Sequence, residues 1–178
     1  SLHLKNLSNY LNKKKISFIK LREPGGSKNA EIIRSLILNK KSTFDKKTDL
    51  LLYLAARNEN MQNIIKKNYK KKVILIDRFI DSTYAYQHYG MGLNKNIIKI
   101  LNSYIVNKLK VDFTFLHIVN QKNLKKRLSK RKVLNRYDKF SISFYNNVQK
   151  GFLNLANKNK KKYLKIISDK NININKKI

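Results

Sequence analysis

The most constraining feature of this sequence is a short apolar run, Val73-Ile74-Leu75-Ile76, which is closed by Asp77-Arg78. A continuous run of this length predicts a strand buried on both faces of a parallel sheet. Alternating or apolar segments predict further strands at residues 16–21, 113–119 and 163–167. His117 lies within one of these strands, and we expect it to lie in the core rather than to act in catalysis.

Apolar residues at helical spacing occupy the stretches between these strands. The predicted helices span residues 1–14, 29–39, 47–69, 82–88, 94–109, 121–131 and 141–159. Strands that alternate with helices predict an α/β fold with a parallel sheet. Because no repeat or linker interrupts the pattern, we expect residues 1–178 to form one domain.

Composition excludes some classes of protein. The chain contains no cysteine, so it has no disulfide and no thiolate metal site, which fits a reducing compartment. No apolar run approaches the length of a membrane span, so we expect no membrane partner. The net charge of +31 raises the possibility of a nucleic-acid or anionic-surface binder. The lysines are spread along the chain, however, which favours compositional drift and a solvated surface.

Two predicted strands end in charged residues with special backbone requirements. Residues 16–21 lead into Arg22-Glu23-Pro24-Gly25-Gly26-Ser27, which holds the single proline and two of the five glycines. The other strand ends in Asp77-Arg78. Ligands of open parallel sheets bind beyond the carboxyl ends of the strands. An acid beside an arginine at such an edge suits Mg²⁺ and phosphate, and the alternative is an ordinary turn and ion pair.

The predicted helix at 47–69 carries an arginine inside its apolar stripe. Arg57 falls near the centre of a stripe that contains Leu50 and Leu54, and Tyr53 lies at its border. A charge in such a stripe is costly unless it is paired. Because Tyr53 and Arg57 are four residues apart, both can meet one ligand, and a ring with a guanidinium suits a nucleobase. The alternative is an arginine that snorkels to the surface or pairs internally.

Residues 125–136 form a strongly basic stretch that holds three of the seven arginines. These residues are placed to close over phosphates and neutralise transition-state charge, and the alternative is a solvated helix end. A phosphate-binding loop of the form G-x-x-x-x-G-K-[ST] is absent from the sequence.

Several stretches in the same order resemble the bacterial thymidylate kinase (dTMP kinase) family. Arg22 to Ser27 is similar to the family's R-E-P-G-G-T, and Leu50-Leu51-Leu52-Tyr53-Leu54-Ala55-Ala56-Arg57 resembles L-L-L-F-x-A-x-R. Asp77-Arg78-Phe79-Ile80-Asp81-Ser82-Thr83-Tyr84-Ala85-Tyr86-Gln87 resembles D-R-Y-x-D-S-S-x-A-Y-Q closely. The resemblance runs from residue 1 to about 168. It implies a three-layer P-loop nucleoside-monophosphate kinase fold, cut just after the phosphate loop, with the first strand and that loop missing.

The resemblance also implies a role for each matching residue. Tyr53, where the family has Phe, would stack on thymine, and Arg57 would hydrogen-bond the base with help from Thr83 and Gln87. Arg34 and Arg78 would hold the dTMP phosphate, and Tyr86 would pack near the deoxyribose. The expected dTMP-binding residues are Glu23, Pro24, Arg34, Tyr53, Arg57, Arg78, Ser82, Thr83, Tyr86 and Gln87.

The expected catalytic residues are Asp77, Arg78, Arg131 and Arg136. Asp77 would act through Mg²⁺ and its waters, whereas Arg131 and Arg136 would contact ATP phosphates from a lid segment at about 125–140. Asn135 departs from the family, which has Asp there. The family implies ATP and dTMP as substrates, a homodimer and a cytoplasmic location.

The missing strand has a structural consequence, and three other functions are possible. Loss of the central strand would leave its neighbours without a hydrogen-bonding partner, so we expect the chain as written to be unstable or inactive alone. The rivals are a kinase for another nucleoside monophosphate, a basic nucleic-acid-binding protein, and a non-catalytic relative that has lost its loop.

Overall fold

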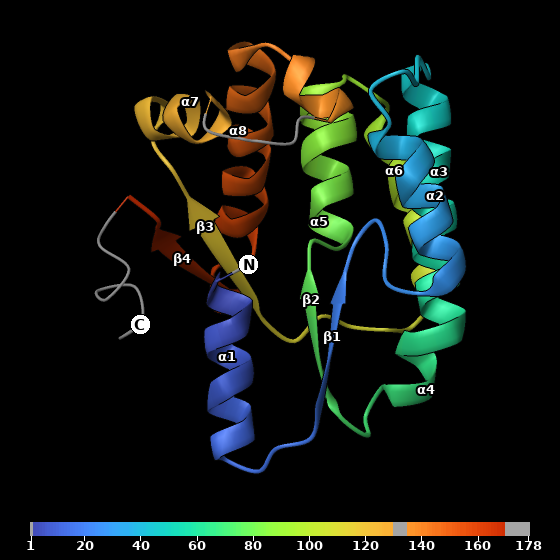
Figure 1. Cartoon of the computed structure of the whole chain (residues 1–178), viewed down its shortest axis with the longest axis vertical. Helices are drawn as coiled ribbons and strands as arrows, with labels where there is room; N and C mark the ends of the chain where they lie inside the picture. Colours follow the sequence, from blue (N-terminus) through green and yellow to red (C-terminus); the bar gives the residue numbers. More distant parts are fainter. Residues whose placement is uncertain (1, 130–134, 170–178) are drawn as a thin grey trace.

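The computed structural model describes residues 2–129 and 135–169 (Figure 1). It contains the predicted strands, each within two residues of its expected bounds. They are β1 (Phe18–Arg22), β2 (Val73–Asp77), β3 (Thr114–Ile118) and β4 (Tyr163–Ile167). The predicted alternation of strands with helices is confirmed.

The strands pair in parallel, but they form two separate sheets. β1 pairs with β2, with Phe18 opposite Val73 and Arg22 opposite Asp77. β3 pairs with β4, with Thr114 opposite Tyr163. Among the described residues, no strand lies between β2 and β3 and the two do not pair with each other. Each of these strands therefore keeps one unpaired edge. The sequence had predicted such unpaired neighbours.

The expectation that β2 is buried on both faces is wrong. Val73 is 40% exposed, and the other four residues of the strand are half-buried. The physical reason is the break between the sheets, because only β1 covers an edge of β2. Phe115, at the equivalent break in β3, is likewise exposed.

The helices follow the predicted apolar spacing. The longer ones are α1 (Leu2–Lys13), α2 (Lys28–Leu38), α3 (Lys46–Asn60), α6 (Lys95–Val106), α7 (Gln121–Ser129) and α8 (Ile142–Lys158). Side-chain oxygens of Ser27, Asp45, Asn94 and Ser141 cap four of them by accepting backbone N–H groups. Each of these helices therefore begins where a capping residue precedes the apolar pattern.

Two of the predicted helices contain a π-helical turn. The helix expected at 47–69 consists of α3, η1 (Met61–Ile65) and the short α4 (Lys66–Asn68). The helix expected at 82–88 is α5 (Ile80–Thr83) followed by η2 (Tyr84–Gly90). Short 3₁₀ turns, η3 (Arg136–Lys139) and η4 (Lys160–Lys162), flank α8.

The helices pack in two groups around the strands. α3 lies between α2 and α6, beside β1 and β2 in Figure 1, and α8 packs against η2. One core cluster joins β1 to η1 through Leu21, Met61 and Ile65. A second cluster, built on Leu50, Leu54 and Ile98, joins α3 to α6. The carboxyl ends of β1 and β2 point towards the top of Figure 1, where the ends of several helices meet.

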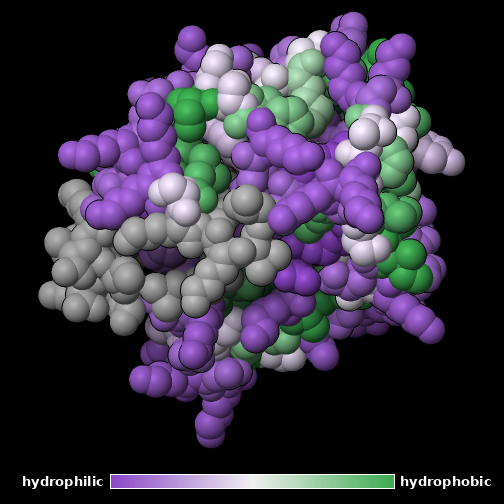
Figure 2. All heavy atoms as spheres, turned by 45° about the horizontal axis from the view of Figure 1, so that its top comes forward, coloured by the Kyte–Doolittle hydropathy of each residue, from purple (hydrophilic) through white to green (hydrophobic). Residues whose placement is uncertain are grey.

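Hydrophilic side chains cover most of the top face, with apolar patches between them (Figure 2). Among the described residues, no helix combines the length and the apolar character that crossing a membrane requires.

Candidate functional site

The charged tips of β1 and β2 lie side by side. Arg22 is the register partner of Asp77, so the residues that follow them, Glu23 and Arg78, leave the sheet at one edge. The Glu23 N–H donates to the Asp77 carbonyl at 3.0 Å and extends this pairing by one residue. The prediction that both charged tips share an edge is therefore confirmed.

The turn after β1 needs glycine at two successive positions. Gly25 and Gly26 have φ values of 148° and 120°, where a side chain is strained, and a Cβ on Gly26 would collide with Leu21. Asn60 at the end of α3 fixes the turn, since its Nδ2 donates to the Gly25 carbonyl at 2.7 Å and its Oδ1 accepts from Ser27 N at 2.9 Å. The turn is thus tied to the helix that carries Arg57.

Pro24 and Arg34 lie together at this turn. The Glu23–Pro24 peptide bond is cis, and Arg34 Nη1 donates to the Pro24 carbonyl at 2.9 Å. Partial burial lowers the pKa of the Arg34 guanidinium from its ordinary value, and nearby Arg22 acts in the same direction. An anion beside Arg34 would relieve this crowding of positive charge.

Arg57 is buried at the centre of a polar network. Its Nε and Nη2 donate to Glu23 Oε2 at 2.8 and 2.7 Å, and Nη1 donates to Thr83 Oγ1 at 2.8 Å and Asn102 Oδ1 at 2.5 Å. Burial acts to raise the pKa of Glu23, and the Arg57 guanidinium opposes that rise. Arg57 thus pairs internally with Glu23, which is the alternative that the sequence left open, and its contact with a base stays a prediction.

Residues from α3, the tip of β2, η2 and η3 form what we call the tyrosine–arginine cluster: Tyr53, Arg78, Tyr86 and Tyr137. The Arg78 guanidinium lies 5.0 Å from the centre of the Tyr86 ring, and Arg78 has a positive φ of 67°. The Tyr137 ring meets Tyr53 edge-on at 6.2 Å and Tyr86 at 6.0 Å. Burial raises the pKa of the Tyr53 hydroxyl, while nearby Tyr137 and Arg78 oppose the rise. Tyr53 and Arg78 thus face a common region.

Asp49 gathers donors from two other segments. It lies in the first turn of α3 and is 1% exposed. Its Oδ2 accepts from the Tyr137 hydroxyl at 2.6 Å and from Gln87 Nε2 at 3.3 Å. Its Oδ1 forms an ion pair with Arg136, whose guanidinium also lies over the Phe44 ring. A single carboxylate therefore joins α3, η2 and η3.

A sequence model of the thymidylate kinase family matches residues 1–178 of this chain. The chain belongs to the thymidylate kinase family. Thymidylate kinase of Ligilactobacillus salivarius (strain UCC118) is 36% identical over 174 residues, which cover 95% of this chain and 84% of the relative. Thymidylate kinase of Sulfurihydrogenibium sp. (strain YO3AOP1) is 37% identical over 162 residues, or 90% of this chain and 78% of the relative.

A solved thymidylate kinase has the same arrangement of elements. The crystal structure of thymidylate kinase from Ehrlichia chaffeensis superimposes with a TM-score of 0.74 at 31% sequence identity. The match covers 98% of this chain and 83% of that structure. The α/β fold of a nucleoside-monophosphate kinase, which the sequence predicted, is thereby supported.

The structure brings most of the expected thymidylate kinase residues to one region, but the polar side chains of Glu23, Arg57, Thr83 and Gln87 are almost fully buried. Thr83 accepts a hydrogen bond from Arg57, and Gln87 donates one to Asp49. The Thr83 and Gln87 side chains are each 1% exposed. Ser82 lies half-buried in α5 beside Thr83. Arg131 lies outside the described residues. Contact of these side chains with dTMP or ATP stays a prediction.

The sequence analysis missed Asp49 and Tyr137. Asp49 precedes Tyr53 by four residues and Arg57 by eight, so all three share one side of α3. An acid one turn before the expected ring was a signal available in the sequence. Tyr137 had no such signal, because only the tertiary structure brings residue 137 to α3.

Arg136 and His117 lie in places that the sequence did not predict. The Arg136 guanidinium faces Asp49 here, so its expected contact with ATP stays a prediction. The expectation that His117 lies in the core is wrong. His117 is exposed, and its ring lies 4.2 Å from that of His3, because β3 has an unpaired edge at the break between the sheets.

The described residues contain no group of three or more His, Cys, Asp or Glu side chains that could hold a metal alone. A single carboxylate such as that of Asp77 still suits Mg²⁺, because proteins usually bind this ion through one or two carboxylates together with substrate phosphates. Asp77 lies at the tip of β2, and its role in holding Mg²⁺ stays a prediction.

Proposed function

We propose that this chain transfers the terminal phosphoryl group of ATP to dTMP, giving dTDP and ADP, with residues 1–178 as one kinase domain. The observation that carries the proposal is the tyrosine–arginine cluster beside the paired strand tips. Its aromatic rings suit a base and its guanidinium suits a phosphate, and the chain belongs to the thymidylate kinase family.

The acceptor side of the proposal rests on α3. Tyr53 supplies a ring face, and Arg57 supplies a hydrogen-bond donor one turn later. A guanidinium has five N–H donors, and four of those on Arg57 are engaged by described residues. The remaining Nη2 N–H can reach a carbonyl oxygen on the base. Glu23 fixes the guanidinium plane, so this donor is oriented before the ligand binds.

The phosphate side of the proposal rests on arginine. Arg78 leaves the tip of β2, and Arg34 is held at the turn after β1, so both suit the phosphate of dTMP. Asp77 would hold Mg²⁺ through water, and the ion would offset charge on the transferred phosphoryl group. The chain's own contribution is to align the acceptor oxygen and to keep both phosphates beside fixed positive groups.

An acceptor panel tests the substrate. We expect the protein to turn over dTMP with ATP, and to turn over dCMP and dGMP much more slowly. Preference for another monophosphate would favour a sister kinase. Salt-dependent binding to arbitrary duplex DNA without any nucleotide turnover would favour the nucleic-acid-binding alternative. Binding of dTMP without turnover would favour a non-catalytic relative.

Replacing Arg78 tests the phosphate site. Arg78→Ala should lower turnover of dTMP by orders of magnitude, because among the described residues Arg78 is the cation that lies over Tyr86 at this strand tip. Arg78→Lys keeps the charge without the planar fork, so it should recover only part of the loss. Steady-state kinetics measure both variants, and near-normal turnover by Arg78→Ala would refute the assignment.

We further propose that the chain acts in the cytoplasm as a homodimer. The absence of cysteine suits a reducing compartment. Support for the dimer comes from α2, α3 and α6, which lie side by side and expose large apolar side chains. These residues are Ile32, Leu36, Leu51, Ile97, Ile100 and Tyr104. A second copy would cover these side chains, because exposed apolar patches often mark protein–protein interfaces.

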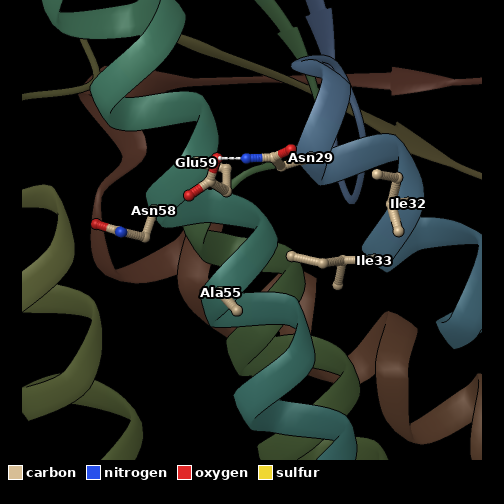
Figure 3. A pocket seen from close by; sticks show the side chains of 6 residues that line it. All are labelled: Asn29, Ile32, Ile33, Ala55, Asn58 and Glu59. Carbon is tan, nitrogen blue, oxygen red and sulfur yellow. Dashed lines mark hydrogen bonds between the residues drawn. The ribbon is translucent and has the colours of Figure 1, made fainter.

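A groove between α2 and α3 adds to this face (Figure 3). Ile32, Ile33 and Ala55 line it, and Asn29 Nδ2 donates to Glu59 Oε2 at 2.8 Å at one end. Light scattering after gel filtration should give twice the chain mass. Leu51→Lys should halve that mass, whereas Tyr10→Lys, on exposed α1, should not. A monomeric parent protein would contradict the proposal.

A further inference from the structure

Asp49 is a buried carboxylate whose partners all come from other segments. Gln87 belongs to η2, whereas Arg136 and Tyr137 belong to η3, so the three donors lie 38 to 88 residues away in sequence. Its place in the first turn of α3 adds the positive end of the helix dipole. The arrangement favours an ionised Asp49 that holds three donors at once.

Two of these donors, Tyr137 and Gln87, lead to the proposed acceptor site. The Tyr137 ring lies edge-on to Tyr53 and Tyr86, the two rings assigned to the nucleoside. The Gln87 amide can donate to a carboxylate only through Nε2. Its Oε1 is therefore the atom turned away from Asp49, and this atom can only accept a hydrogen bond.

We propose that Asp49 is a positioning residue that sets the acceptor-nucleoside site. It fixes the Gln87 amide as an acceptor for a ring N–H and holds Tyr137 against Tyr53. This inference rests on the proposed function, because the ligand it positions for is dTMP. A base with a ring N–H, as in thymine, fits an acceptor here, whereas cytosine presents a ring nitrogen without hydrogen.

Contacts around Arg136 strengthen the same connection. Arg136 Nη1 approaches the Phe44 carbonyl at 3.5 Å, and Lys139 Nζ approaches the Lys40 carbonyl at 3.4 Å. Tyr145 donates its hydroxyl to the Tyr137 carbonyl at 2.8 Å and so ties η3 to α8. The segment at 135–140 thus docks on the N-terminal end of α3, with Asp49 as its buried anchor.

Asp49→Asn and Tyr137→Phe test the proposal through binding of dTMP by calorimetry. Asp49→Asn keeps the shape but removes the charge, and we expect it to weaken dTMP binding about tenfold. Tyr137→Phe removes the hydroxyl alone and should weaken binding by a similar or smaller factor. Both changes affect the same hydrogen bond, that between Tyr137 and Asp49. The double variant should therefore bind dTMP with an affinity within about twofold of that of Asp49→Asn, whereas the two losses of affinity would multiply if the effects were independent.

Tyr163→Phe is the matched control. Tyr163 also donates to a carboxylate at 2.6 Å, but that carboxylate is Asp81 in α5 rather than Asp49. It should lower the melting temperature as Tyr137→Phe does and leave dTMP affinity within about twofold. If Asp49→Asn fails to fold, Tyr137→Phe and its control carry the test.

Hydrogen exchange supplies a second readout. In the unmutated protein, dTMP should increase protection of the amides at 135–140, and this increase should be lost in Tyr137→Phe but not in Tyr163→Phe. Unchanged dTMP affinity in both Asp49→Asn and Tyr137→Phe, with an unmutated protein that binds dTMP, would overturn the inference. An unmutated protein that fails to bind dTMP would instead overturn the proposed function.

Discussion

Arg57 is a buried, paired side chain that is also the residue proposed to recognise the base. It is 1% exposed, and Glu23, also buried, accepts from two of its nitrogens. A buried charge pair costs desolvation energy, and breaking it leaves the remaining charge uncompensated. The same pairing holds the guanidinium plane in one orientation, which a base-recognition role requires. The pair therefore links the turn after β1 to α3.

Replacement of Arg57 should expose this dual role. Arg57→Met should lower the free energy of unfolding by about 3–5 kcal/mol, because Glu23 would stay buried without a partner. The double variant Glu23→Leu/Arg57→Met should lose less than Arg57→Met alone. Urea unfolding followed by circular dichroism measures both. Equal losses in the single and double variants would show that the buried carboxylate is not the source of the cost.

At the scale of elements, close packing between η2 and α8 positions the site. η2 carries Tyr86 and Gln87, and its π-helical turn lies next to α8. Gly151 in α8 permits this contact, since a Cβ there would approach Tyr89 Cδ2 to 2.6 Å. π-helical turns inside helices occur frequently at functional sites. The packing of η2, which carries Tyr86, therefore depends on a glycine in α8.

A methyl group at Gly151 should disturb this packing. Gly151→Ala should lower the free energy of unfolding by about 1–3 kcal/mol through overpacking against Tyr89, despite its higher helix propensity. Asn154→Ala, on the exposed side of the same helix, should leave stability unchanged or slightly raised. Thermal unfolding of the two variants gives the comparison. A stabilised Gly151→Ala would mean that the helices separate at little cost.

The sequence predicted the elements better than the contacts between them. Apolar spacing located α3, and the shared edge of Asp77 and Arg22 followed from parallel pairing. Arg57 stood out because a charge in an apolar stripe demands a partner. The contact between Asp49 and Tyr137 could not be predicted, because their hydrogen bond joins residues 88 positions apart in the sequence. The half-exposed β2 could not be predicted, since burial of a strand depends on which neighbours pair with it.

At the scale of the whole molecule, two small sheets and a large positive charge set the conditions for stability. β2 and β3 each leave one edge unpaired among the described residues, and the formal charge is +31. The core therefore relies on contacts between helices and on buried polar groups such as Asp49. Exposed strand edges favour association with other chains, so handling at low concentration and moderate salt suits this protein.

Buried tyrosines should make stability depend on alkaline pH. Burial raises the pKa of Tyr137 above its ordinary value of 10.0, and nearby Tyr53 adds to the rise. The folded state therefore keeps a proton that the unfolded state loses. This contribution to stability is complete below pH 10 and falls above it by up to about 1.4 kcal/mol per pH unit. In Tyr137→Phe the fall should be shallower by that amount, as urea unfolding between pH 9 and 11 would measure, and identical slopes would contradict the assignment.

The central claim is that dTMP binds with its base against Tyr53 and its phosphate beside Arg78. A crystal structure of the protein with dTMP tests this claim most directly. In this complex we expect the thymine ring to stack on the Tyr53 ring, within hydrogen-bond reach of Arg57 or Gln87. We expect the phosphate to be held by Arg34 and Arg78. A nucleotide bound elsewhere, with Tyr53 and Arg78 free of it, would contradict the account.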